Sequence, residues 1–172
     1  DLYYDLCNQM YSVRSKKYKA GLYGASDHIA QGYMTWATPD GRKAHAPFAP
    51  GANPSYGAEK NGLLASLNSV AKLPYEYALD GISNTQTISP DALGHSLEER
   101  KDNLWHILDG YFDQGPHHLN VNVFTRETLL DAQAHPENSK DLVVRVAGFS
   151  AYFVELHITG QNDLISRTEL SL

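Results

Sequence analysis

The sequence predicts an α/β fold whose strands pair in parallel. Segments in which apolar residues recur at helical spacing alternate with short segments of β-branched or alternating residues. Such alternation is typical of helices that cross between neighbouring parallel strands. The 172 residues are enough for one domain with a core, and they contain no internal repeat, low-complexity tract or obvious domain boundary.

The first half of the chain is predicted to hold two amphipathic helices, at residues 2–18 and 61–73, with one strand between them. The first ends in basic side chains, which suit a helix C-terminus, and the second closes before Pro74. Residues 22–36, mixed apolar and small, are predicted as a strand with irregular flanks. Residues 37–54 contain four prolines and a Pro-Asp-Gly turn, so we expect a long loop that is either functional or a linker.

The middle of the chain carries two predicted strands with a helix between them. Residues 82–88 alternate loosely and end at a Ser-Pro step, as a strand that enters a loop would. Ser96 and Glu99 form a capping box, which predicts the start of an amphipathic helix that runs to Phe112. Residues 119–123 alternate cleanly and are predicted as the second strand.

The C-terminal part is predicted to close the fold with two helices around an apolar segment. Thr125 caps the first of these helices, which ends before Pro136, and residues 161–170 form the second. Between them, residues 142–154 are the most apolar part of the chain. Valines lead into this segment and aromatic residues lead out of it, so it is predicted as a buried strand that enters a loop.

Composition argues against several classes of function. The formal net charge is −6 and no basic cluster carries interleaved aromatic residues, so no nucleic-acid partner is expected. No apolar run approaches the roughly 20 residues that span a bilayer, and no signal peptide precedes the first predicted helix, so no membrane partner is expected. Cys7 is the single cysteine, which excludes an internal disulfide and fits a reducing compartment. The sequence therefore predicts a soluble, cytoplasmic protein.

The eight histidines do not form a recognisable metal site. His117 and His118 are adjacent, so in an extended chain they point to opposite faces. His95 and His106 are too far apart to pair on a helix, and no Cys-x-x-Cys is present. No glycine-rich phosphate loop occurs, and Ser150 does not stand in a Gly-x-Ser-x-Gly elbow. We expect no bound metal and no serine nucleophile.

Gly148 lies in the middle of the most apolar segment, where packing alone would favour a side chain. Glycine inside such a run destabilises by about 0.5–1 kcal/mol relative to alanine, so it usually marks a turn, a bulge or a close backbone approach. One kind of chemistry also requires glycine there. A backbone radical is stabilised when Cα becomes planar and the unpaired electron spreads onto the flanking amides, and a side chain would clash in that state. The radical also needs a hydrophobic surround that excludes water.

The residues around this glycine, Arg145-Val146-Ala147-Gly148-Phe149-Ser150-Ala151-Tyr152-Phe153, resemble the C-terminal signature of the glycyl radical enzymes. That family carries its radical glycine about two dozen residues before the chain end, and Gly148 lies 24 residues before Leu172. Upstream segments resemble the C-terminal third of the pyruvate formate-lyases, so the resemblance runs from about Thr38 to Leu172. These segments are residues 38–44, 50–54, 65–74, 80–83, 92–94, 109–112 and 118–123.

The resemblance implies that the chain is the C-terminal part of a ten-stranded α/β barrel, with the radical glycine on a buried loop. Residues 1–172 would form a single glycyl-radical domain or fragment, with residues 1–37 as part of the barrel and a linker and residues 38–172 as the family's C-terminal region. The family's thiyl-forming cysteine and substrate-binding arginines fall upstream, and no adjacent cysteine pair occurs here. We therefore expect a piece of a larger enzyme or a separate radical-bearing subunit, incomplete as a catalyst by itself.

The resemblance also implies roles for individual residues. Gly148 would store the radical after an activating enzyme, which holds an iron–sulfur cluster and uses S-adenosylmethionine, removes one of its hydrogens. The residues that would present the loop to this activator are Arg145, Val146, Ala147, Phe149 and Ser150. The candidates for lining a substrate pocket are Asn84, Thr85, Gln86 and Ser89. Since the loop must be buried at rest and exposed for activation, we expect a mobile segment around Gly148.

Three functions remain open at this point. The resemblance to pyruvate formate-lyase implies radical cleavage of pyruvate, with coenzyme A as co-substrate, in a homodimer of the full enzyme. Residues 149–156 look more like the dehydratase and lyase branches of the family, which favours another glycyl radical reaction. The third possibility is a non-catalytic subunit that docks onto an oxygen-damaged partner and replaces its lost radical domain.

Overall fold

The computed structural model describes residues 2–10, 13–14, 27–78 and 81–168. The helices in these residues are α1 (Leu2–Gln9), α2 (His28–Tyr33), α3 (Leu63–Ala71), α4 (Leu97–Phe112), α5 (Arg126–Ala134) and α6 (Ile158–Thr168). The strands are β1 (Thr85–Ile88), β2 (Asn120–Val123), β3 (Val143–Arg145) and β4 (Ser150–Tyr152).

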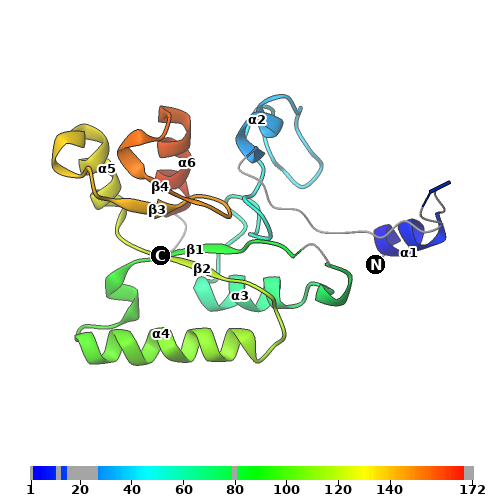
Figure 1. Ribbon diagram of the computed structural model, residues 1–172, viewed down its shortest axis with the longest axis horizontal. Coiled ribbons are helices and arrows are strands. Elements are labelled where there is room, and N and C mark those ends of the chain that lie inside the picture. Colours follow the sequence, from blue (N-terminus) through cyan, green and yellow to red (C-terminus); the bar gives the residue numbers. More distant parts are fainter. Residues whose placement is uncertain (1, 11–12, 15–26, 79–80, 169–172) are drawn as a thin grey trace.

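A parallel pair of strands, β1 and β2, lies at the centre of the fold (Figure 1). Their register places Thr85 opposite Asn120 and Ile88 opposite Val123, and all four residues of β1 are buried. Helices α3 and α4 lie on one side of this pair, and the β3–β4 hairpin with α5 and α6 lies on the other. The predicted α/β class and its parallel pairing are confirmed.

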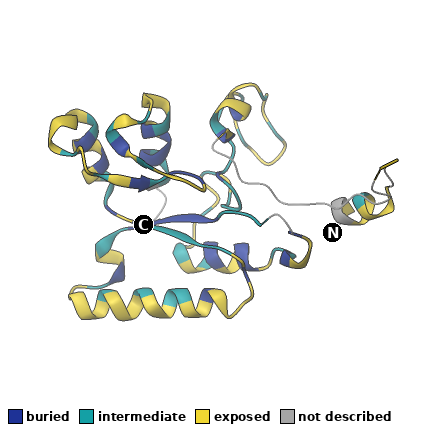
Figure 2. Ribbon diagram, in the orientation of Figure 1, coloured by how far each residue is buried: buried dark blue, intermediate teal, exposed yellow. Residues whose placement is uncertain are grey.

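Two apolar cores separate these layers, and the buried residues follow the inner faces of the elements (Figure 2). The smaller core packs α3 against α4 and is built from Leu67, Ala71 and Tyr111. The larger core lies under the hairpin and consists of Phe124, Leu129, Ala132, Val144, Val146, Phe153, Leu164 and Ile165. The strand that leads to Gly148 is therefore packed against α5 and α6.

The hairpin pairs β3 and β4 in antiparallel fashion across Gly148. Val143 lies opposite Tyr152, and Arg145 lies opposite Ser150. Val144 is fully buried, whereas Val143 is 54% exposed, so the two faces of the hairpin differ sharply. The predicted strand is confirmed as β3, but of its three residues only Val144 is buried, and the chain after Gly148 returns as a second strand.

Most of the other predicted elements are confirmed. The capping box starts α4, since Ser96 accepts from the Glu99 N–H and the Glu99 carboxylate accepts from the Ser96 N–H. Thr125 caps α5 by accepting from the Thr128 N–H. The predicted strands at residues 82–88 and 119–123 are shortened to β1 and β2, and residues 37–54 hold neither helix nor strand.

One prediction was wrong, because residues 28–33 of the predicted strand 22–36 form the helix α2. The buried residues of α2 are His28 and Gly32, which stand four apart on one helix face. A Cβ on Gly32 would lie 2.4 Å from the Ala46 carbonyl oxygen, so glycine lets residues 46–48 pass close to the helix. Because a histidine and a glycine form the inward face, a hydrophobic pattern did not reveal it.

Two helices differ from their predicted bounds. α1 ends at Gln9, and most of the remaining predicted stretch to residue 18 lies outside the described residues. α6 begins at Ile158, three residues earlier than predicted, while residues 169–170 of the prediction lie outside the described part. None of the helices in the described part of the chain is long and apolar enough to cross a membrane.

Candidate functional site

Gly148 lies at the tip of the β3–β4 hairpin. The Val146 N–H donates to the Phe149 carbonyl at 2.9 Å, so Ala147 and Gly148 form a two-residue turn. The φ of Gly148 is +81°, a value typical of the third position of a type II turn and one that glycine adopts without strain. A Cβ built on Gly148 would meet nothing within 4 Å. Glycine is therefore required at this tip by backbone conformation, not by lack of space.

The tip of the turn is open. Gly148, Phe149 and Ser150 are all exposed. The prediction of a buried loop around Gly148 is therefore not met within the described residues. The physical reason is that the turn projects beyond the hairpin, and the core below it reaches only as far as Val146 and the Ala147 side chain. Any enclosure of the Gly148 Cα has to come from outside the described residues.

The residues predicted to flank the tip do meet around one turn, but they differ in burial. Val146 and Ala147 are each 5% exposed, and Val146 belongs to the larger core. Phe149 is 42% exposed, and the Ser150 hydroxyl accepts from Nη1 of Arg145 at 3.2 Å. A partner could reach the side of the turn that follows Gly148, whereas the side before it is packed against the protein.

Asn122, which sequence analysis did not single out, holds the strand before the turn. Its Oδ1 accepts from the Arg145 N–H at 2.9 Å, and its Nδ2 donates to the Arg145 carbonyl at 2.9 Å. The side chain of Asn122 is buried on β2, so one amide pairs with β3 as a neighbouring strand would. This contact joins the hairpin to the central parallel pair.

A buried polar cluster holds the turn from the other side. Arg167, on α6, donates from Nη1 to the Val146 carbonyl at 2.5 Å and binds the Asp163 carboxylate through Nε at 3.0 Å and through Nη2. The Asp163 carboxylate also accepts from His28 Nε2 at 3.1 Å and from the Tyr56 hydroxyl. The side chains of Asp163 and Arg167 are only 2% and 8% exposed. The signal available in the sequence was the i, i+4 spacing of opposite charges on the closing helix.

The charge state of this cluster follows from its contacts. Burial raises the pKa of Asp163, but the hydrogen bond from His28, the positive charge of Arg167 and the hydrogen bond from Tyr56 together hold that pKa below its ordinary value of 3.8. Burial is also the main reason why the pKa of Tyr56 is raised above its ordinary value of 10. At neutral pH the cluster therefore contains a carboxylate, a guanidinium and a protonated phenol.

The loop between α2 and α3, residues 34–62, is tied to β1 in the same way as the hairpin is tied to β2. Nδ2 of Asn53 donates to the Thr85 carbonyl at 2.7 Å, and its Oδ1 accepts from the Thr85 N–H at 3.0 Å. Beside it, a Cβ on Gly51 would lie 2.1 Å from the Ser83 carbonyl oxygen, so glycine permits the close approach. The loop is consequently an ordered part of the fold and not a linker.

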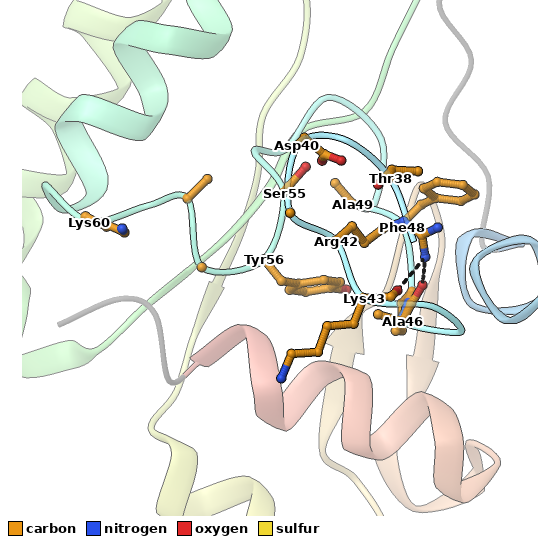
Figure 3. A pocket seen from close by; sticks show the side chains of 14 residues that line it. Thr38, Asp40, Arg42, Lys43, Ala46, Phe48, Ala49, Ser55, Tyr56 and Lys60 are labelled. Atoms are coloured by element: carbon orange, nitrogen blue, oxygen red, sulfur yellow. Dashed lines mark hydrogen bonds between the residues drawn. The ribbon is translucent and has the colours of Figure 1, made fainter. Parts of the chain in front are cut away.

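A cavity of about 770 Å³ lies within this loop (Figure 3). Arg42 lines the cavity and donates to the carbonyl oxygens of Ala46 and Trp36. Its guanidinium carbon lies 4.5 Å from the centre of the Phe48 ring. These contacts show that Arg42 organises the loop. Tyr56 lines the cavity and also reaches Asp163, so the cavity wall and the buried cluster share one side chain.

The residues predicted to line a substrate pocket lie on or beside β1. Asn84, Thr85 and Gln86 are buried, whereas Ser89 is half-buried. Nε2 of Gln86 donates to the Ser66 hydroxyl at 3.0 Å and to Oδ1 of Asn84 at 3.2 Å. Thr85 and Gln86 line a hollow of about 20 Å³. Their role in a substrate pocket stays a prediction.

The adjacent histidines have separate structural contacts. The ring of His117 lies 4.9 Å from that of Tyr75, and Nδ1 of His118 accepts from the Asn84 N–H at 3.3 Å. Burial, together with the charge of Arg145, lowers the pKa of His118. Among the described residues, no group of three or more histidine, cysteine or carboxylate side chains is placed to hold a metal ion.

Comparison with known proteins identifies the family of this site. A family model described as "Glycine radical" matches residues 48–154, which contain the whole hairpin and its turn. The chain belongs to the glycyl radical enzyme family. It is also 51% identical over 148 residues to the PFL-like enzyme TdcE of Escherichia coli (strain K12), across 83% of this chain and 19% of that protein.

Solved structures of glycyl radical enzymes resemble the chain closely. One comes from work on 1,2-propanediol dehydration in Roseburia inulinivorans, with a TM-score of 0.85 and 43% identity. Another is the glycerol-bound B12-independent glycerol dehydratase from Clostridium butyricum, with a TM-score of 0.84 and 40% identity. Hydroxyproline dehydratase from Clostridioides difficile follows with a TM-score of 0.83 and 33% identity. Each match covers 96% of this chain and 21% of the other, so the chain spans about a fifth of the length of the relatives it matches.

Proposed function

We propose that this chain is the radical-bearing C-terminal region of a pyruvate formate-lyase-like enzyme and that Gly148 stores the radical. The observation that carries the proposal is the turn itself. A glycine is demanded there by the backbone, its Cα is open on one side, and the preceding residue is anchored in the larger core. The 51% identity to the PFL-like enzyme TdcE supports the choice of reaction.

The turn suits the activation step. An activating enzyme with an iron–sulfur cluster and S-adenosylmethionine removes one hydrogen atom, a proton with one electron, from the Cα of Gly148. The carbon then flattens, and the unpaired electron spreads onto the peptide groups that Gly148 shares with Ala147 and Phe149. Apart from the neighbouring residues Ala147 and Phe149, no described atom lies within 4 Å of the place where a Cβ would stand on this carbon, so the flattening meets no side chain from elsewhere in the described chain on that side. Val146, held in the core and by Arg167, keeps the strand before the turn in place.

Shielding of the radical is assigned to the rest of the proposed barrel. The hairpin leaves three apolar side chains exposed: Val143 and Tyr152, which pair across its strands, at 54% and 46%, and Phe149, directly after Gly148, at 42%. A cover over these side chains would bury apolar surface and keep water and oxygen from the turn. In the proposed enzyme the Gly148 radical takes a hydrogen atom from a cysteine under that cover. The thiyl adds to the pyruvate carbonyl, and the bond between that carbonyl and the carboxylate breaks homolytically, which leaves an acetyl thioester on the cysteine and a formate radical anion. The radical anion takes a hydrogen atom from a thiol and becomes formate, and the acetyl group passes to the thiol of coenzyme A.

A dehydratase is the second candidate. The two solved structures with 43% and 40% identity concern propanediol dehydration and a glycerol dehydratase, and residues 149–156 resemble that branch. Both candidates use the same turn and the same activation. They differ in the substrate, which other parts of the barrel would bind.

The proposal is tested by anaerobic activation of the enzyme that contains this chain, followed by electron paramagnetic resonance. We expect a doublet signal that collapses when the α-hydrogens of glycine are replaced by deuterium. Gly148→Ala should give no signal, and air should cut the activated wild-type chain at residue 148. An activated enzyme whose signal survives in Gly148→Ala would refute the role of this residue.

Product analysis separates the two reactions. The activated enzyme is incubated with pyruvate and coenzyme A, and in parallel with 1,2-propanediol and with glycerol. Formate and acetyl-coenzyme A support the pyruvate formate-lyase-like reaction. Aldehyde formed from 1,2-propanediol or from glycerol contradicts it and favours a dehydratase.

A further inference from the structure

The contacts of Arg167 suggest a function beyond stability. Its guanidinium binds the Asp163 carboxylate on its own helix and the carbonyl of Val146, two residues before Gly148, and its Nη2 also lies 3.3 Å from Nε2 of His28. The Val146 N–H, on the opposite side of the same residue, closes the turn by donating to Phe149. Arg167 therefore contacts the backbone of the residue at which the turn begins.

Asp163 extends this contact to the rest of the chain. It receives hydrogen bonds from His28 on α2 and from Tyr56 in the α2–α3 loop, which come from residues 135 and 107 positions away. An arginine that binds a carboxylate and a carbonyl together has little rotational freedom, because its planar group is held at several points. Thus α6, α2 and the loop meet at the Asp163 carboxylate, and Arg167 links that carboxylate to the turn.

We propose that the Arg167–Asp163 pair is a positioning device for the radical turn: it sets how often the strand that leads into Gly148 separates from α6. This inference rests on the proposed function of Gly148. Release of the turn requires the Val146 carbonyl to separate from Arg167. A hydrogen bond from a charged donor changes such an opening equilibrium by about tenfold. Arg167 is a positioning residue in this scheme, since it acts on Gly148 through Val146.

Arg167→Lys is the main test, made in the complete enzyme. A lysine keeps the positive charge beside Asp163, but its single ammonium cannot bind the carboxylate and the Val146 carbonyl in the same geometry. Two readouts are taken per folded protein: the hydrogen-exchange rate of the Val146 amide relative to that of Val144, and the initial rate of radical formation with limiting activating enzyme. We expect the exchange ratio to rise about tenfold and activation to become several-fold faster.

Arg100→Lys is the matched control. Arg100, at the start of α4, also binds a carboxylate and a backbone carbonyl, with Nη2 to Asp91 at 3.0 Å and Nε to Gly94 at 2.8 Å. The Arg100→Lys variant should leave the exchange ratio and the activation rate unchanged. A purely structural role of Arg167 would lower the melting temperature and speed exchange at Val144 and Val146 alike. A uniform change in exchange, or an unchanged activation rate, would overturn the proposal.

A second pair of variants keeps the test valid if Arg167→Lys does not fold. Tyr56→Phe removes only the hydroxyl that binds Asp163, and Tyr75→Phe removes a comparable buried hydroxyl that donates to the Val70 carbonyl at 2.9 Å. We expect Tyr56→Phe to raise the exchange rate of the Val146 amide relative to that of Val144. Tyr75→Phe should leave this ratio unchanged. If the wild-type enzyme forms no radical, the proposed function fails, but the exchange ratio still tests the positioning role. Equal ratios in both tyrosine variants would overturn that role.

Discussion

At the residue scale, glycines with similar backbone angles are required for different reasons. Gly57 and Gly148 have φ values of +79° and +81°, and a Cβ on either would meet nothing within 4 Å. Gly51 has a φ of +62°, but a Cβ there would lie 2.1 Å from the Ser83 carbonyl oxygen. The first two glycines allow a turn, whereas Gly51 also allows two backbone segments to touch. Of these two requirements, only the close backbone approach at Gly51 depends on a distant part of the chain.

This difference predicts unequal effects of the same substitution. Gly51→Ala and Gly57→Ala should both lose about 1–2 kcal/mol of unfolding free energy, because alanine is strained at positive φ. Gly51→Ala should lose a further 1–3 kcal/mol or so, since the new methyl group pushes the loop away from β1. Urea unfolding of the two variants measures the difference. Equal midpoints would show that the loop yields without resistance at Ser83.

At the element scale, two asparagine side chains replace missing strand neighbours. Asn122 joins the hairpin to β2, and Asn53 joins the α2–α3 loop to β1, each by donating to and accepting from one backbone residue. Both asparagines lie in segments whose resemblance to the pyruvate formate-lyases was visible in the sequence. The physical reason for their presence became clear only when their partners in other elements were known.

The Asn122 contact predicts a stability effect. Asn122→Ala leaves the N–H and carbonyl of Arg145 without these partners, which should destabilise the protein by about 1–3 kcal/mol. Asn138→Ala, at an exposed asparagine on the surface, should change stability by no more than about 0.5 kcal/mol. The two variants are compared by urea unfolding. Indistinguishable midpoints would mean that solvent replaces the amide of Asn122 at no cost.

The elements themselves were largely predictable because their signals are local. The capping box of α4, the cap of α5 and the alternation in β2 each lie within a few residues. Two features were not local. α2 turns a histidine and a glycine inward, and β4 owes its strand geometry to pairing with β3. No pattern within either segment specifies a partner elsewhere in the chain.

At the scale of the whole molecule, one carboxylate connects three separate parts. Asp163 on α6 binds His28 of α2 and Tyr56 of the α2–α3 loop, in addition to Arg167. Since the folded-state pKa of Asp163 is below its ordinary value of 3.8, the folded protein binds this proton less readily than the unfolded chain. The group therefore stabilises the fold above pH 3.8, and that contribution is lost as the pH falls through the lowered pKa.

The linkage predicts how acid acts on the protein. Asp163→Asn should lower the unfolding free energy at pH 7 by about 3–5 kcal/mol, because Arg167 is left buried without its partner. It should also make the loss of stability below about pH 4 less steep, since one shifted carboxyl no longer titrates. Denaturant unfolding between pH 7 and pH 3 gives the slope of the unfolding free energy against pH for the wild type and for Asp163→Asn. Parallel curves for the two proteins would contradict the assigned pKa shift.

The candidate site was predictable to an unequal degree. Gly148 and its neighbours were singled out because the segment that resembles the family signature occupies nine consecutive residues. His28 and Tyr56 were missed because they lie more than 100 positions from Asp163, and such a distance leaves no signature in one sequence. For Asp163 and Arg167 the sequence offered only their i, i+4 spacing, which does not by itself mark a buried pair. The predicted burial of the Gly148 loop was not met, since surfaces that would cover it are not among the described residues.

The missing side chain at the tip of the hairpin also has a stereochemical consequence. Under the proposed role, the Cα of Gly148 loses and regains a hydrogen many times. A flattened carbon can be rehydrogenated from either face, and at any chiral residue the wrong face would yield the D-enantiomer. Gly148 carries two hydrogens, so both faces regenerate the same molecule. Repeated use of this carbon therefore leaves no epimerised residue in the chain.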